Sequence, residues 1–480
     1  MGFDSQWPKM WGQQSSLFVV QRVVCKTIFI DAQIQLMKSF VKEDETSWRQ
    51  FIRRTFFAPV AEFHRRYDTV IVCFDNYQNV PVFKSIEQSK RTAASSAAKS
   101  HNFQFKAGDE LPSKPYEQKI WVQALQNRSF KSNIISLITS MMAAEYTPPR
   151  VATTLVIDFV NSTRIDYLTH SKTRTVLEHL KPMGESDVKF MRYVPLFGDM
   201  CVDSIDSDVL LIAALFVSRN SYKGNIYVRR YKTRLPAPPS SAASAAASIP
   251  NTTHQGPGPP AGQETAVCKR KAPEAVHTKP EKRRLEYEII HVNLLLGVLH
   301  TTMHNAAAMS SQNDQIQQVS QAHLTAMLSF MVLLCGCDYS KKLPRIGVKS
   351  LWDNMDVVVP AMMQCTSYVD NVFAVDTEVS INGLIASLYA RIYTKHMASA
   401  STSNINMHAV LARLHASTLS DKTKNDLPTH DSLNTTLRNI EWVINYWSIE
   451  NGDPICPIDG THGFLLVNNK IVAGGPPPAQ

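Results

Sequence analysis

Two short runs of apolar and β-branched residues each end in an aspartate. Residues 27–30 lead into Asp31, and residues 70–74 lead into Asp75. Between them, over residues 48–63, apolar side chains recur at helical spacing. Continuous apolar runs that alternate with helices are typical of a parallel sheet covered on both faces. The pattern therefore predicts an α/β fold, in which ligands sit beyond the carboxyl ends of the strands.

The rest of the chain extends this pattern. Residues 134–142 read as a helix, 151–159 as a strand, and the apolar run 209–217 follows an acidic segment. A second long apolar run, 324–334, predicts a buried helix, and the chain after residue 349 is expected to be mainly helical, with 436–448 amphipathic.

Residues 232–284 are rich in Pro, Ala, Ser and Gly and cannot build a core, so we expect a disordered insertion. Its far end carries two basic clusters ten residues apart, which suit a bipartite nuclear-import signal, although a solvated basic loop would look the same. The clusters are Lys269, Arg270, Lys271 and Lys282, Arg283, Arg284. The expected location is therefore the nucleus, or otherwise the cytoplasm.

Composition narrows the class of partner. The net charge of +9 and a pI near 9.0 favour a polyanion, although a role in solubility would look the same. The apolar stretch 324–337 is too short to span a bilayer, so no membrane partner is expected. The eight cysteines include no C-x-x-C pair and read as reduced thiols.

Seven acidic residues stand at the edges of apolar segments along the chain. Each alone is most simply a helix cap or a turn residue, but together they would repel unless divalent cations neutralised them. Two Mg²⁺ ions about 4 Å apart would do so, with Mn²⁺ as a substitute. The acids are Asp31, Asp75, Glu185, Asp187, Asp206, Asp208 and Asp338.

The order of these segments and their local sequences resemble those of the flap endonuclease (FEN/XPG) superfamily of structure-specific 5′ nucleases. The matching motifs are Ile30-Asp31-Ala32, Cys73-Phe74-Asp75, Glu185-x-Asp187, Asp206-x-Asp208 and Gly336-x-Asp338-Tyr339. The resemblance, to a divergent member, implies a PIN-like α/β nuclease core in which these acids hold the metal ions. It covers about residues 1–355 and implies a core at 1–231, with a helical arch at about 76–131, and a further nuclease region at 285–358. Composition places the insertion between them at 232–284, and the apolar pattern predicts a helical region at 359–480.

Two basic elements carry the resemblance further. Residues 84–91 resemble the start of the helical arch, which implies that Lys84 and Arg91 approach the scissile phosphate. Residues 343–349 resemble a helix-three-turn-helix that grips duplex DNA, with a bound K⁺ ion, although Arg345 stands where the family's turn usually has glycine. The implied duplex-binding residues are Lys341, Lys342, Gly347 and Lys349.

The resemblance implies a monomeric, Mg²⁺-dependent phosphodiesterase that cuts DNA with a 5′ flap, nick or junction, with no clear sliding-clamp motif. Two alternatives stay open. One is an endoribonuclease of the host-shutoff type on the same fold; the other is a scaffold that binds nucleic acid without cutting it. The duplex-binding turn favours DNA, and the full set of acids argues against an inactive scaffold.

Overall fold

The computed structural model describes residues 12–39, 45–76, 121–122, 124–125, 127–180, 183–204, 206, 208–231, 287–308, 318–336, 343–393, 406–447, 464–467 and 470–473. Within Met1–Arg230 and Glu288–Gln480, the described residues belong to one compact unit. The predicted insertion and both of its basic clusters lie outside the described residues.

A nine-stranded mixed sheet organises this unit, in the order β1-β9-β8-β7-β2-β3-β4-β5-β6. The central strands β8, β7, β2, β3 and β4 run parallel, and β5 and β6 continue the sheet as an antiparallel hairpin. The strands are Val19–Val20 (β1), Thr27–Asp31 (β2), Thr69–Cys73 (β3), Thr153–Asp158 (β4), Ser162–Tyr167 (β5), Lys172–Val176 (β6), Met200–Asp203 (β7), Ile226–Tyr231 (β8) and Tyr287–His291 (β9).

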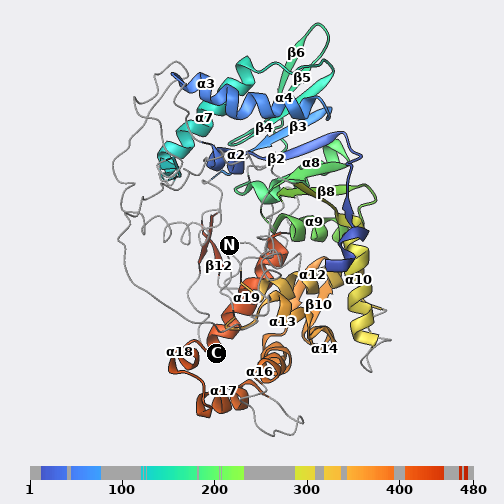
Figure 1. Cartoon of the computed structure of the whole chain (residues 1–480), viewed down its shortest axis with the longest axis vertical. Coiled ribbons are helices and arrows are strands. Elements are labelled where there is room, and N and C mark those ends of the chain that lie inside the picture. The colour runs from blue at the N-terminus through green and yellow to red at the C-terminus, as the bar shows by residue number, and fades with distance from the viewer. Residues whose placement is uncertain are drawn as a thin grey trace, which may run out of the picture. The chain divides into compact units, whose positions relative to one another are not determined.

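Burial on both faces explains why the central strands are apolar throughout. In β3, Val70 and Val72 pack into one core, whereas Ile71 and Cys73 point to the opposite core, because successive side chains alternate across a strand. Figure 1 shows α4 and α7 on one side of the sheet and α8 and α9 on the other. The α/β fold with a mostly parallel centre is therefore confirmed.

The first face is covered by helices that precede or follow β3 in the chain. They are Ala32–Lys38 (α2), Trp48–Ile52 (α3), the π-helical turn Arg53–Phe57 (η3), Ala58–His64 (α4) and Arg128–Glu145 (α7). The second face is covered by Ser186–Phe197 (α8) and Asp208–Arg219 (α9), and Val292–Ala308 (α10) and Gln321–Leu333 (α12) pack on α9.

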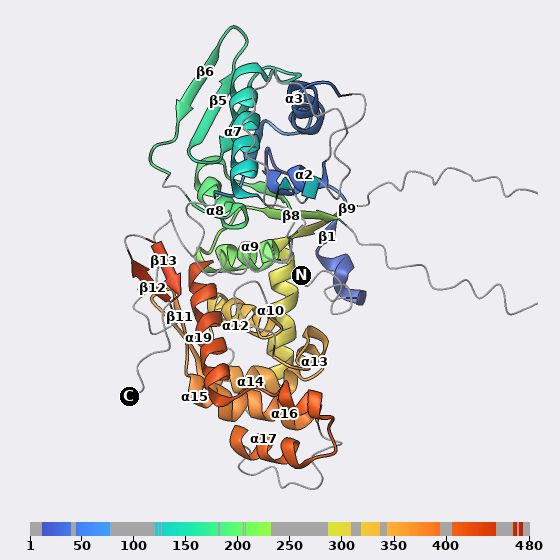
Figure 2. The same ribbon diagram turned by 90° about the vertical axis from the view of Figure 1, so that its left-hand side faces the viewer.

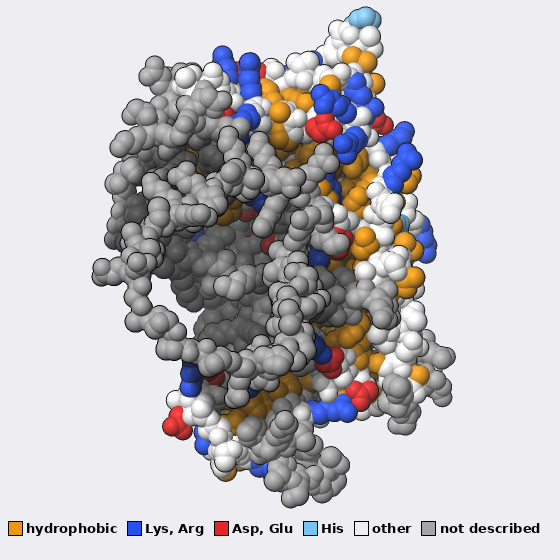
Figure 3. Space-filling model, in the orientation of Figure 1, with side chains coloured by type: hydrophobic (Ala, Val, Ile, Leu, Met, Phe, Trp, Pro, Cys, Tyr) orange, Lys and Arg blue, Asp and Glu red, His pale blue; other side chains and the backbone are white. Residues whose placement is uncertain are grey.

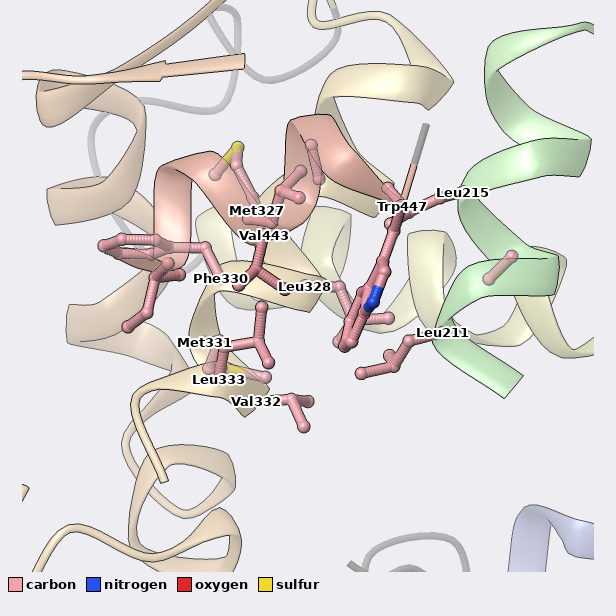
Figure 4. Packing of buried hydrophobic residues seen from close by; sticks show 14 of the residues in the cluster. Leu211, Leu215, Met327, Leu328, Phe330, Met331, Val332, Leu333, Val443 and Trp447 are labelled. Atoms are coloured by element: carbon pink, nitrogen blue, oxygen red, sulfur yellow. The ribbon is translucent and has the colours of Figure 1, made fainter. Parts of the chain in front are cut away.

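Helix α12 is buried all round, since every residue from Leu324 to Leu333 is buried. It packs on α9, α10 and the later helix His430–Tyr446 (α19). Figure 4 shows Trp447, just past α19, lying beside Leu211 and Leu215 of α9. The predicted apolar helix is confirmed, and it joins the sheet to the C-terminal helices in a single hydrophobic core.

The C-terminal part is mainly helical, as predicted, but it also contains two short hairpins. Its helices are Val348–Trp352 (α13), Met355–Cys365 (α14), Thr377–Val379 (α15), the π-helical Ser380–Ile385 (η6), Ala386–Ile392 (α16), Met407–Ala416 (α17) and Asp421–Asn425 (α18). Its strands are Thr366–Val369 (β10), Val372–Val375 (β11), Phe464–Val467 (β12) and Lys470–Ala473 (β13). Figure 2 shows α14, α16 and α17 gathered on the side of α12 away from the sheet. Among the described helices, none combines the length and apolarity that a bilayer crossing requires.

Candidate functional site at the carboxyl edge of the sheet

The parallel strands end at one level and deliver acidic residues there. Asp31, the last residue of β2, is paired in register with Cys73 of β3, and Cys73 is paired with Asp158 of β4. On the other side of β2, Ile30 is paired with Asp203, the last residue of β7. Because these strands are parallel, their carboxyl ends form one edge of the sheet. The edge therefore carries Asp31, Asp158 and Asp203, and the chain continues from β3 directly into Asp75.

Asp31 is the electrostatic centre of this edge. Its carboxyl is 7% exposed and caps α2 by accepting the N–H of Gln33 at 3.1 Å. Burial, together with the carboxylates of Asp75 and Asp206, raises its pKa from 3.8 to about 7, against hydrogen bonds from Ser186 and Gln33. The carboxylates of Asp75 and Asp206 therefore both act on Asp31 and disfavour its ionised form.

The first turn of α8 meets Asp75. The backbone N–H of Ser186 donates to Asp75 Oδ1 at 2.9 Å, and the Ser186 hydroxyl donates to the same oxygen at 3.0 Å. Glu185 is the buried residue that precedes this helix, and Asp187 lies in its first turn. The predicted Glu185-x-Asp187 pair thus flanks the residue that holds Asp75.

Asp206 and Asp208 lie between β7 and α9. The N–H of Asp206 donates to Ser204 Oγ at 3.1 Å, and the N–H of Asp208 donates to Asp206 Oδ1 at 3.3 Å. Asp208 is the first residue of α9. These bonds hold the predicted acid pair in a turn at the same edge of the sheet.

The described residues contain part of the predicted site. Asp338, Lys84, Arg91, Lys341 and Lys342 lie outside them, and their roles stay predictions. Among the side chains that the structure does describe, no group of three or more His, Cys, Asp or Glu has the arrangement to hold a metal ion. The acids that are described nevertheless suit Mg²⁺ in kind, because carboxylate oxygen is the ligand that this hard cation prefers.

A buried charge cluster next to this edge was missed by the sequence analysis. The carboxylate of Asp158 accepts hydrogen bonds from Lys189 Nζ at 3.2 Å, from the Arg192 guanidinium, and from Tyr193 Oη at 2.7 Å. Burial alone would raise the pKa of Asp158, but Lys189 and Arg192 outweigh burial and lower it. The position of Asp158 at the end of an apolar run was the signal that could have identified it.

Asp203 is a second missed acid at the edge. Burial raises its pKa, and the positive charges of Arg229 and Lys38 oppose that rise. Its Oδ1 lies 3.5 Å from Nε of Arg229 on β8. Asp203 therefore belongs to the same carboxyl edge of the sheet as Asp31.

The predicted duplex-binding turn is only partly described, from residue 343. Arg345 has φ of +60°, the left-handed conformation for which glycine is usual, so the turn keeps this backbone shape without glycine. The N–H of Gly347 donates to Ser350 Oγ at 2.9 Å, which uses this amide within α13. Lys349 forms an exposed ion pair with Asp353. DNA binding by Gly347 and Lys349 stays a prediction.

Charge on the surface is uneven. On the face in Figure 3, Lys and Arg side chains gather in the upper part, where α4 and β3 to β5 lie. A cavity of about 520 Å³ lies at the opposite end of α9 from Asp208, where Arg219 meets the start of α12 and the β10–β11 turn. Tyr368 and Asp370 line it as well. This cavity is separate from the acidic edge.

No protein-family model matches the sequence, and no curated protein is detectably similar to it.

Proposed function

We propose that the protein is a divalent-metal-dependent nuclease of the 5′ flap endonuclease type, with a PIN-like core, that hydrolyses DNA at a 5′ flap, nick or junction. One observation carries this proposal: the buried Asp31 ends a parallel strand at the sheet edge where the start of α8 holds Asp75, and burial with the charges of Asp75 and Asp206 raises its pKa to about 7. A nuclear location follows from the basic clusters in the predicted insertion.

The donor set suits two Mg²⁺ ions. Repelling carboxylates that are held in place by the fold favour a cation, because its charge removes the cost of ionising them together. The proposed ligands are Asp31, Asp75, Glu185, Asp187, Asp206, Asp208 and Asp338. When bound, the ions would activate water and polarise the phosphodiester.

The chain's own residues have separate tasks in this proposal. The acids at the sheet edge bind the cations, and Lys84 and Arg91 orient and neutralise the scissile phosphate. Lys349 is available for a DNA phosphate at little cost, because its partner Asp353 is exposed and such pairs contribute under about 1 kcal/mol. The duplex would also be bound by Lys341, Lys342 and Gly347. These contacts would fix the position of the DNA without reading its sequence.

A paired cleavage assay tests the proposal. A 5′-flap DNA and a single-stranded RNA are incubated with the protein in Mg²⁺ or in EDTA. We expect Mg²⁺-dependent cutting of the DNA, and a loss of at least about 100-fold in Asp31→Asn with DNA binding kept. Asn can still accept the Gln33 N–H and cap α2.

Asp68→Asn is the matched control. Asp68 immediately precedes β3, at the amino edge of the sheet, and pairs with Arg150 at 2.7 Å. This variant should cut like the wild type. An Asp31→Asn protein with full activity would contradict the metal assignment, cutting of RNA alone would contradict the DNA substrate, and binding without cutting would indicate a scaffold.

A further inference from the structure

The segment after β3 is held along its length by the start of α8. The N–H of Asn76 donates to the carbonyl oxygen of Gly184 at 2.6 Å. The Nζ of Lys189, one turn into α8 and 0% exposed, donates to the carbonyl oxygen of Phe74 at 2.7 Å. The backbone on one side of Asp75 is therefore fixed to α8, and on the other side to the segment just before this helix.

Ser186 adds the contact to the Asp75 side chain itself. Its N–H and its hydroxyl both donate to Asp75 Oδ1, at 2.9 Å and 3.0 Å. Ser186 also lowers the pKa of Asp31, against the rise that burial and the charge of Asp75 cause. Ser186 thus lies between two acids that are delivered by two different strands.

This arrangement differs from ordinary helix capping. The residue at the N-cap of α8 is Glu185, and Ser186 is the first helical residue. A capping serine bonds an N–H of its own helix, whereas the Ser186 hydroxyl bonds a carboxylate 111 residues away in the chain. Its contacts serve the acidic edge rather than the helix end.

We propose that Ser186 is a positioning residue, which fixes Asp75 relative to Asp31 so that both can bind a divalent cation. The inference rests on the proposed function, since it concerns the same site. Groups that hold metal ligands in place change metal affinity when they are removed, even though they do not touch the ion.

Two variants of Ser186 remove its contacts in steps. Ser186→Ala removes the hydroxyl bond and keeps the backbone bond. Ser186→Pro removes both, at a helix position where proline is tolerated and after a residue, Glu185, whose extended conformation suits a following proline. Ser329→Ala is the control, because this equally buried serine bonds only within α12, to the carbonyl oxygen of Thr325.

The measurement is calorimetric titration of each full-length protein with Mn²⁺, together with the Mn²⁺-induced shift in melting temperature. We expect about 10-fold weaker Mn²⁺ binding in Ser186→Ala and up to about 100-fold weaker binding in Ser186→Pro. Ser329→Ala should bind like the wild type. Cutting of 5′-flap DNA should need correspondingly more Mg²⁺ in the two Ser186 variants.

Wild-type Mn²⁺ affinity in a folded Ser186→Ala protein would overturn the inference and leave the proposed function intact. An equal loss in Ser329→Ala would also overturn it, because the effect would then be general destabilisation. A wild-type protein that binds no Mn²⁺ and cuts no DNA would overturn the proposed function, and this inference with it.

Discussion

Two aspartates on either side of β3 show how neighbouring charges set the pKa of a buried carboxylate. Asp31 ends β2 and Asp158 ends β4, and they are 7% and 1% exposed. Burial raises the pKa of both, yet Lys189 and Arg192 lower the pKa of Asp158 overall, whereas Asp75 and Asp206 push that of Asp31 to about 7. The same residue type, at the same place in neighbouring strands, therefore ends in opposite electrostatic states.

The difference lies in the partners. Asp158 has its countercharges inside the protein, so its cluster can stabilise the fold without a ligand. Asp31 instead has the negative charges of Asp75 and Asp206 near it, and under the proposed function a divalent cation would neutralise them. The comparison can be tested by substitutions at the two positions, which should act in opposite directions.

The largest effect is expected from Asp158→Asn. The change leaves Lys189 and Arg192 buried beside a neutral amide, and breaking a buried ion pair costs about 3–5 kcal/mol. Urea denaturation at pH 8 should show a lower free energy of unfolding by this amount. A loss below about 1 kcal/mol would mean that the cluster is not a compensated charge group.

Asp31→Asn should instead raise the free energy of unfolding in metal-free buffer. At pH 8 the native carboxyl is ionised against a raised pKa, and a shift from 3.8 to about 7 corresponds to a gain of up to about 4 kcal/mol when the charge is removed. The same denaturation experiment, with EDTA present, measures it. A variant less stable than the wild type would contradict the repulsion among the acids.

The pH dependence sharpens the contrast. The unfolded Asp31 carboxyl loses its proton near pH 3.8 and the folded one near pH 7, so its contribution should lower wild-type stability as pH rises from about 4 to about 7. Asp158, with its lowered pKa, contributes stability that is lost only in acid. Melting temperatures of the wild type and Asp31→Asn in EDTA should converge near pH 4 and diverge by pH 8; parallel curves would refute the assignment.

The smallest effect on stability is expected at the predicted duplex-binding turn. Lys349→Ala removes an exposed ion pair with Asp353, so the free energy of unfolding should change by under about 0.5 kcal/mol. If Lys349 contacts a phosphate, the slope of log affinity for duplex DNA against log salt should fall by about 1. An unchanged slope would remove Lys349 from the interface.

Local sequence pattern was sufficient for the strand ends. The apolar runs before Asp31 and Asp75 predicted β2, β3 and their parallel arrangement, and the structure brings these two acids together. These features depend on side-chain period and burial, which sequence records directly.

The compensating charges could not be read in the same way. Lys189 and Arg192 lie on a helix, where a basic residue usually faces solvent. The packing of α8 against β2, β3 and β7 buries them. Strands β5 and β6 were also missed. Strand β6 is exposed along its length, so no apolar run marks it. The burial of these basic residues and the formation of β5 and β6 depend on packing and pairing between distant segments. A local sequence pattern does not reveal such pairing.

The most direct test of the account is anomalous diffraction from crystals of the full-length protein soaked in Mn²⁺. The account predicts manganese within about 2.3 Å of carboxylate oxygens of Asp31 or Asp75, at the carboxyl edge of the sheet. Ordered manganese elsewhere and none beside these two aspartates would contradict it.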